Sequence, residues 1–95
     1  MTRQRLPNRR QSTRIEIEHN GARYPITFSR FSDGRLGEIF IDSPKPNSEI
    51  AAHMNDGAVL VSLLLQHGVS PSEIRRSISG PLSLALAMAD QEVEP

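Results

Sequence analysis

The stretch RIEIEHNGARYPITFSRFSDGRLGEIFID, residues 14–42, contains three short runs in which apolar and polar residues alternate. Alternation with a period of two is typical of strands that bury one face. The dipeptides Asn20-Gly21 and Asp33-Gly34 separate the runs, and both favour tight turns between antiparallel strands. This stretch therefore predicts a three-stranded antiparallel meander.

The same stretch makes two finer predictions about the sheet. Pro25 has no backbone N–H, so we expect the second strand to have a free edge or a bulge at that residue. In the third strand, the parity of the positions places Ile39 and Ile41 on one face. The residues expected on the other face are Leu36, Glu38 and Phe40.

The sequence after Pro44 predicts helices. Apolar residues recur at helical spacing from Ile50 to Leu65, and Gly68 ends this long helix. The segment Ser70-Pro71-Ser72-Glu73 has the form of a capping box and starts a second helix, which we expect to end near Gly80. The run LSLALAMA, residues 82–89, predicts a short third helix. The expected fold class is α+β, a three-stranded antiparallel β-meander followed by two or three helices packed on one face.

Length and composition suit one domain. We expect a flexible Arg-rich arm over residues 1–13, a single α+β domain over residues 14–89 and an acidic tail over residues 90–95. The absence of Cys excludes disulfides and thiolate metal sites. The start of the chain has no apolar signal region, and no apolar run approaches the roughly 20 residues that span a bilayer, so we expect a cytoplasmic protein.

Charge is unevenly distributed although the net charge is zero. Residues 1–35 carry eight Arg and three acids, a net charge of +5, and residues 36–95 carry three bases and eight acids, a net charge of −5. Two interpretations of the arm remain open: a solvated tail, or an arm that binds nucleic acid or an acidic partner. The candidate polyanion-binding residues are Arg3, Arg5, Arg9, Arg10 and Arg14.

The second half of the long helix is apolar on most sides, which is typical of a helix buried on most sides. In so small a chain, the sheet alone does not cover such a helix. We therefore expect a homodimer, formed through this helix or through a free sheet edge. Gly57 is unfavourable inside a helix and predicts the close approach of another backbone. The candidate interface residues are Met54, Gly57, Val61, Leu64 and Leu65.

The sequence predicts no catalytic, metal or cofactor site. His19, His53 and His67 lack the spacing of metal ligands, and we expect His67 to lie at the end of a helix. Glu38 and Asp42 are expected to serve structure rather than acid–base catalysis, with Glu38 paired to Arg23 or Arg35. Ser62 and Ser70 have no nucleophile-elbow sequence around them.

Three segments, in this order, resemble the TSCPD domain: RLPNRR at residues 5–10, DGRLGEIFID at residues 33–42 and VSLLLQHGVSPSEI at residues 61–74. That domain is found near the C-terminus of adenosylcobalamin-dependent (class II) ribonucleotide reductases and in small standalone proteins. The signature Thr-Ser-Cys-Pro-Asp that names the domain is absent, and SGPLSLALAMAD, residues 79–90, stands in its place.

The resemblance implies an accessory domain rather than the reductase itself, because the family's radical chemistry needs cysteines and a cobalamin site in a separate barrel. The expected function is a non-catalytic interaction module that acts by protein–protein association in nucleotide or DNA metabolism. A ribonucleotide reductase is one expected partner. The alternative is a small nucleic-acid-binding protein that uses the N-terminal Arg arm.

Overall fold

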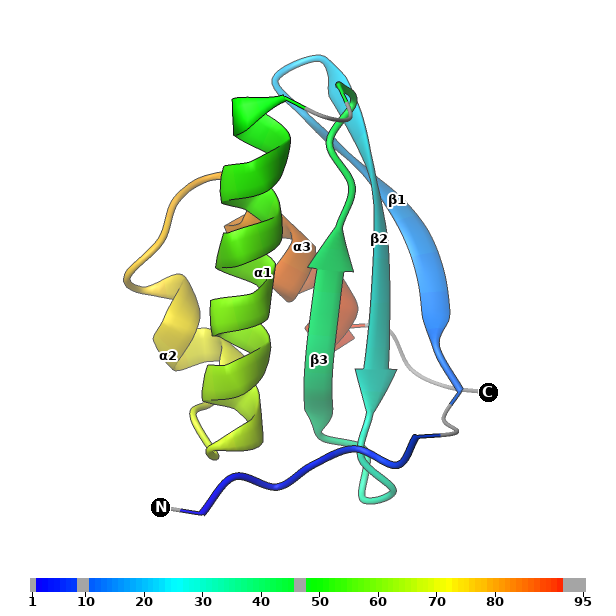
Figure 1. Ribbon diagram of the computed structural model, residues 1–95, viewed down its shortest axis with the longest axis vertical. Helices are drawn as coiled ribbons and strands as arrows, with labels where there is room; N and C mark the ends of the chain where they lie inside the picture. Colours follow the sequence, from blue (N-terminus) through cyan, green and yellow to red (C-terminus); the bar gives the residue numbers. More distant parts are fainter. Residues whose placement is uncertain (1, 9–10, 46–47, 92–95) are drawn as a thin grey trace.

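The computed structural model describes residues 2–8, 11–45 and 48–91. Within these residues, the strands β1 (Thr13–His19), β2 (Ala22–Arg30) and β3 (Leu36–Ile41) form an antiparallel sheet in the order β1-β2-β3 (Figure 1). The helices α1 (Glu49–Gln66), α2 (Pro71–Arg75) and α3 (Pro81–Gln91) follow. The predicted α+β class and meander are confirmed.

Both predicted turns are present. Asn20 (φ 51°) and Gly21 (φ 80°) occupy the left-handed region, as a two-residue turn between twisted strands requires. In the second turn Gly34 has φ 93°, and the Asp33 carboxylate accepts a hydrogen bond from the Arg35 N–H at 3.0 Å. These local preferences fix the order and direction of the strands.

Pro25 lies in the central strand, which has no free edge, and it pairs with Glu16 without a bulge. The N–H of Asp42 donates to the carbonyl of Pro25 at 3.0 Å. In antiparallel pairs the N and O atoms of one residue point to the same neighbour, so the nitrogen of Pro25 faces the end of β3. The ladder between β1 and β2 therefore never needs the N–H that Pro25 lacks.

The irregularity in the sheet lies between Ser29 and Arg30, not at Pro25. Ser29 pairs with Glu38, whereas Arg30 pairs with Leu36, so one residue of β3 is extra at this point. Because of this extra residue, the positions of β3 before it point to the opposite face from the one that simple alternation predicts. Leu36 consequently joins the core at 4% exposure, although the sequence grouped it with the opposite face.

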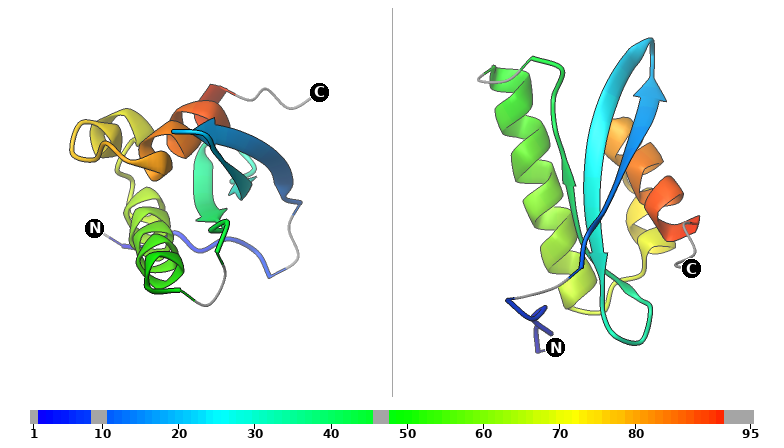
Figure 2. Two further views of the ribbon diagram at one scale, coloured as in Figure 1. Left: turned by 90° about the horizontal axis from the view of Figure 1, so that it is seen from above. Right: turned by 90° about the vertical axis from the view of Figure 1, so that its right-hand side faces the viewer.

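One aliphatic core lies between the sheet and the helices, and α1 packs against β3 while α3 contacts all three strands (Figure 2). Phe28 adds an aromatic side chain at 1% exposure. The remaining members of the core are Ile17, Ile26, Leu36, Ile39, Ile41, Ala58, Val61, Leu65, Ile74, Ala85, Leu86 and Ala89.

The helix boundaries follow the capping residues. The hydroxyl of Ser48 accepts the Ala51 N–H at 3.1 Å at the start of α1, and Gly68 (φ 90°) follows its end. The hydroxyl of Ser70 accepts the Glu73 N–H at 3.2 Å at the start of α2. The predicted end of the long helix at Gly68 and the predicted start of the second helix at Ser70 are thus confirmed.

The second helix is shorter than the sequence predicts. It ends at Arg75, five residues before Gly80, and Ile78 packs against the core from the following loop. Apolar spacing alone does not separate a helix from a turn that buries the same side chain. The third helix, by contrast, runs on to Gln91 and includes the first two residues of the predicted acidic tail.

Polar side chains of α1 close the outer edge of β3. The hydroxyl of Ser62 accepts the Ile39 N–H and donates to the Ile39 carbonyl, each at 3.0 Å. One turn later, the side-chain amide of Gln66 donates to the Gly37 carbonyl at 3.1 Å. Both side chains are buried, so they replace the water that would otherwise bind this edge.

We expect Ser62→Ala to lower the free energy of unfolding by about 1–3 kcal/mol, because it leaves the buried N–H and C=O of Ile39 without partners. Ser77→Ala removes a hydroxyl at an exposed position and should change stability by less than about 0.5 kcal/mol. Urea unfolding of both variants checks this, and equal stability of the two would contradict the role of Ser62.

Gly57 faces a side chain rather than the backbone that the sequence predicts. A Cβ atom built at Gly57 would lie 3.4 Å from Cδ2 of Leu82, an ordinary contact distance.

We therefore expect Gly57→Ala to raise the free energy of unfolding by about 0.5–1 kcal/mol through helix propensity. Gly68→Ala is the matched control, and its positive φ should make it destabilising by about 1–2 kcal/mol. Thermal unfolding measures both variants. A Gly57→Ala variant less stable than the wild-type chain would show that Leu82 leaves no room for the added methyl group.

Candidate functional site

An apolar groove runs along α1, where the helix faces α2 and the start of α3. It consists of two cavities of about 330 and 290 Å³ that share Gly57 and Leu82. The first is lined by Gly57, Leu60, Val61, Leu64, Val69, Glu73, Ile74, Ser77, Ile78 and Leu82. The second is lined by Ile50, His53, Met54, Gly57, Gly80, Pro81 and Leu82.

The predicted interface residues divide between the groove and the core of the chain, and Val61 belongs to both. Met54, Gly57, Val61 and Leu64 line the groove, and Leu64 is 44% exposed. Val61 and Leu65, at 5% and 3% exposure, belong to the core of their own chain. Their substitution would disturb folding before it disturbed any partner.

The most exposed apolar residues of α1 are two that the sequence did not single out. Ile50 is 64% exposed and Leu60 is 62% exposed, and each lines one of the two cavities. Helical periodicity could have found Leu60, because it lies three residues from Gly57 and four from Leu64 on one side of the helix. Periodicity alone does not show which side of α1 packs against β3, and that contact decides which apolar residues are buried.

The chemistry of the groove is apolar with few polar groups. Glu73 and Ser77 contribute polar atoms to the first cavity and His53 to the second. Neither cavity is lined by Arg or Lys, the side chains that most often pair with phosphate. The groove suits an apolar side chain or helix rather than a nucleotide.

The histidines lie apart from one another in the fold. His67 is at the end of α1, where its Nδ1 lies 2.8 Å from the carbonyl of Leu63. His53 lies 3.8 Å from Glu49 on the exposed surface of α1, and His19 ends β1. Among residues 2–8, 11–45 and 48–91, no three His, Asp or Glu side chains come together in a way that could hold a metal ion.

The carboxylates of Glu38, in β3, and Asp42, directly after β3, lie in different environments. Glu38 is buried at 7% exposure, whereas Asp42 is exposed and lies 3.9 Å from Arg14. The arginines that the sequence suggested as partners of Glu38 make other ion pairs: Arg23 with Glu16 at 3.7 Å, and Arg35 with Asp33 at 2.7 Å.

The N-terminal residues contact the end of α1. Arg3 Nε donates to the side-chain oxygen of Gln66 at 2.6 Å, and the Gln4 N–H donates to the Gln66 carbonyl at 2.7 Å. Leu6 lies against Gly37, so close that a Cβ atom added to this glycine would come within 3.0 Å of Cδ2 of Leu6. Arg5 and Arg14 are exposed, while Arg9 and Arg10 of the predicted polyanion site lie outside the described residues.

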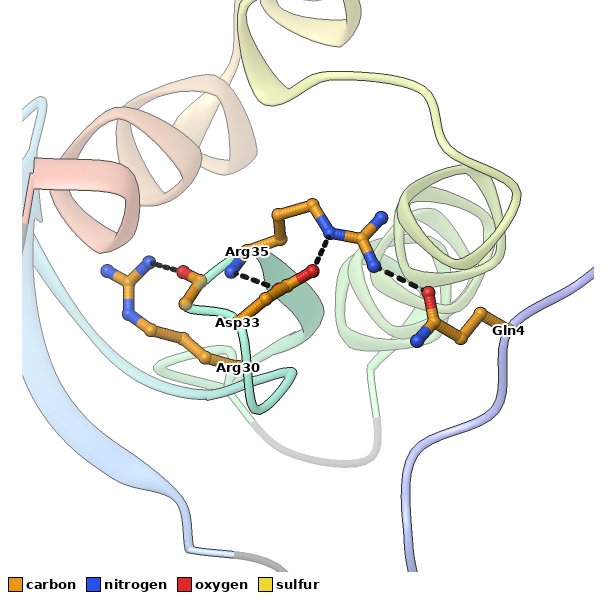
Figure 3. A network of polar contacts seen from close by, with 5 residues as sticks. Gln4, Arg30, Asp33 and Arg35 are labelled. Carbon is orange, nitrogen blue, oxygen red and sulfur yellow. Dashed lines mark hydrogen bonds and ion pairs between the residues drawn. The ribbon is translucent and has the colours of Figure 1, made fainter.

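A polar network surrounds the β2–β3 turn (Figure 3). Arg35 donates to Asp33 at 2.7 Å and reaches Gln4 at 2.6 Å, while Arg30 donates to the Gly34 carbonyl at 3.0 Å. Hydrogen bonds from the backbone and side chain of Arg35 hold the pKa of the exposed Asp33 carboxyl below its ordinary value. This carboxyl therefore stays ionised at neutral pH and holds the turn that faces the N-terminal residues.

None of the helices in the described part of the chain has the length and apolar character needed to cross a membrane.

Comparison with known proteins identifies relatives over most of the chain. The vitamin B12-dependent ribonucleotide reductase of Agrobacterium fabrum (strain C58) is 42% identical over 71 residues, which cover 75% of this chain and 6% of the reductase. The enzyme of the same description from Bradyrhizobium diazoefficiens is 37% identical over 71 residues, with the same shares. That of Rhodopirellula baltica is 35% identical over 72 residues, 76% of this chain and 7% of the reductase.

The chain thus spans less than a tenth of the length of these relatives. No solved structure matches it significantly. The TSCPD domain profile matches residues 1–87, nearly the whole chain, in agreement with the resemblance seen in its sequence. The chain belongs to the TSCPD domain family.

Proposed function

We propose that this chain is a non-catalytic interaction module that associates with a B12-dependent ribonucleotide reductase through the groove along α1. The observation that carries the proposal is the exposure of Leu60, Leu64 and Ile50 beside preformed apolar cavities. Large exposed apolar side chains next to a groove mark protein interaction sites in soluble domains.

The choice of a reductase as partner rests on the relatives. In three of them, a segment similar to this chain forms 6–7% of a B12-dependent ribonucleotide reductase. A domain that is covalently attached to an enzyme works at high effective concentration beside it. A domain of the same family can use the same contacts when it meets the enzyme as a separate chain.

The groove itself supports association rather than catalysis. Its polar side chains are few: Glu73 and Ser77 line the first cavity, and His53 lines the second. An acid–base pair would need two such groups within reach of one substrate atom. The shape and composition instead fit the apolar face of a helix from the partner.

Binding of the purified chain to the B12-dependent reductase of its host organism tests the proposal. Leu60→Asp and Leu64→Asp should each weaken binding about tenfold or more, because a carboxylate in an apolar contact loses its hydration. Val59→Asp is the matched control: Val59 is 42% exposed on the same helix but does not line the groove, so its affinity should stay within about twofold. Circular dichroism of each variant confirms that the fold is retained.

Salt dependence separates this function from nucleic-acid binding by the arm. Association through the groove should change little between about 0.1 and 0.5 M salt, because it depends on apolar contacts. Nucleic-acid binding should fall steeply over that range and weaken further in an Arg5→Gln, Arg9→Gln, Arg10→Gln variant. Affinity for the reductase that is unchanged by Leu60→Asp and Leu64→Asp would contradict the proposal, and tight salt-sensitive binding of single-stranded or duplex DNA would favour the alternative.

A further inference from the structure

The two edges of the sheet differ. Ser62 and Gln66 cover the outer edge of β3, whereas the outer edge of β1 carries no helix-derived hydrogen bond of this kind among the described residues. β1 is seven residues long and pairs with β2 over its whole length without a bulge. A long, regular and uncovered edge is a template for pairing with another strand.

The register shows which backbone groups of β1 point outward. Because the N and O atoms of Pro25 face β3, its partner Glu16 must point its own N–H and C=O away from β2. Alternation along the strand gives Arg14 and Glu18 the same orientation. Within the part of the chain that the structure describes, no backbone hydrogen bond uses the groups of these three residues on the outer side.

The charges along this edge are self-complementary. In an antiparallel pair of two β1 strands related by a two-fold axis at Ile15, Arg14 of each copy lies opposite Glu16 of the other. Both are residues whose backbone groups point outward, as the hydrogen-bonded positions of the new ladder require. An axis at Glu16 would instead place two glutamates directly opposite each other, which is unfavourable.

The side chains on the other face of β1 suit the same register. It brings Ile15 opposite Ile15 of the second copy at the axis, and Thr13 opposite Ile17. Ile15 is half-buried and packs against the core of its own chain, so the contact would extend the apolar face of each sheet toward the other. Arg14 and Glu16 have side chains that are 66% and 54% exposed, and their ion pairs within the chain are long, at 3.9 and 3.7 Å.

We propose that two copies of this chain pair antiparallel through their β1 strands, with Ile15 on the two-fold axis, to form a continuous six-stranded sheet. The strand that pairs with this edge is β1 of a second copy, because an antiparallel copy places its Glu16 opposite Arg14 and its Arg14 opposite Glu16. This surface is separate from the groove along α1, so the dimer leaves the groove of each copy accessible.

Charge reversal tests the register. Arg14→Glu and Glu16→Arg each place like charges at both cross-strand pairs, so each variant alone should dimerise about tenfold more weakly than the wild-type chain in analytical ultracentrifugation. An equimolar mixture of the two variants restores both opposite-charge pairs, and it should form a heterodimer about as readily as the wild-type chain forms its homodimer. A role of these residues in folding alone would not produce rescue by mixing.

Cross-linking tests the axis. The chain has no Cys, so Ile15→Cys introduces a single thiol that meets its own copy at a position where Cα atoms lie about 4.5 Å apart. Mild oxidation should convert the Ile15→Cys variant to a disulfide-linked dimer. The control is Glu18→Cys, whose thiols lie about 20 Å apart in this register, and it should remain a monomer over the same time.

Four results would overturn the proposal. They are a wild-type chain that stays monomeric into the millimolar range, a dimer that ignores both charge reversals, equal cross-linking of the two Cys variants, and a dimer that is instead lost in Leu60→Asp. The last result would place the contact between copies on α1.

Discussion

The contact between α1 and β3 determines the rest of this structure. Ser62 and Gln66 are four residues apart on the helix, a rise of about 6 Å, and they meet backbone groups of Ile39 and Gly37, which lie two residues apart on a strand, a distance of about 6.6 Å. The two repeats match closely enough for both side chains to bond at once. Apolar contacts permit a helix to slide or rotate, but these directional bonds permit one register.

The rotation of α1 fixed in this way explains where its apolar side chains lie. The side of the helix that carries Ser62 faces the strand, and Ala58, Val61 and Leu65 beside it enter the core. Leu60 and Leu64 consequently lie on the side toward α2, where they border an open groove. The covered edge of β3 also makes the sheet asymmetric, because in residues 2–8, 11–45 and 48–91 no helix side chain bonds to the outer edge of β1. Both proposed interaction surfaces thus follow from the same two polar side chains.

Local sequence signals were sufficient for much of the fold. The alternation in residues 14–42, the Asn-Gly and Asp-Gly turns, the cap at Ser70 and the helix end at Gly68 depend on a few neighbouring residues, so they can be predicted without knowledge of distant contacts. The extra residue of β3 opposite Ser29 and Arg30, and the burial of Leu36, could not be predicted in this way. They depend on how two strands meet, and one extra residue changes the face of every position before it.

The candidate site was predicted less completely for a related reason. Periodicity identified the apolar side of α1 but could not divide its members between the core and the groove, and it therefore grouped the buried Val61 and Leu65 with the exposed Leu64. That division depends on β3 and on Leu82 of α3, which are distant in sequence. Gln66 was overlooked for the same reason. Nothing in the local sequence distinguishes a polar residue at a helix end, and its partners Arg3, Gln4 and Gly37 are all distant in sequence.

The position of Gln66 also sets an order of events during synthesis. Arg3 and Gln4 are synthesised before the sheet and the helices, but their partner Gln66 lies 63 residues after Arg3, at the far end of α1. The chain must complete the meander and the long helix before residues 3–4 can bond to Gln66. Residues 3–4 can therefore dock only after α1 has formed, and their attachment reports that the end of this helix is in place.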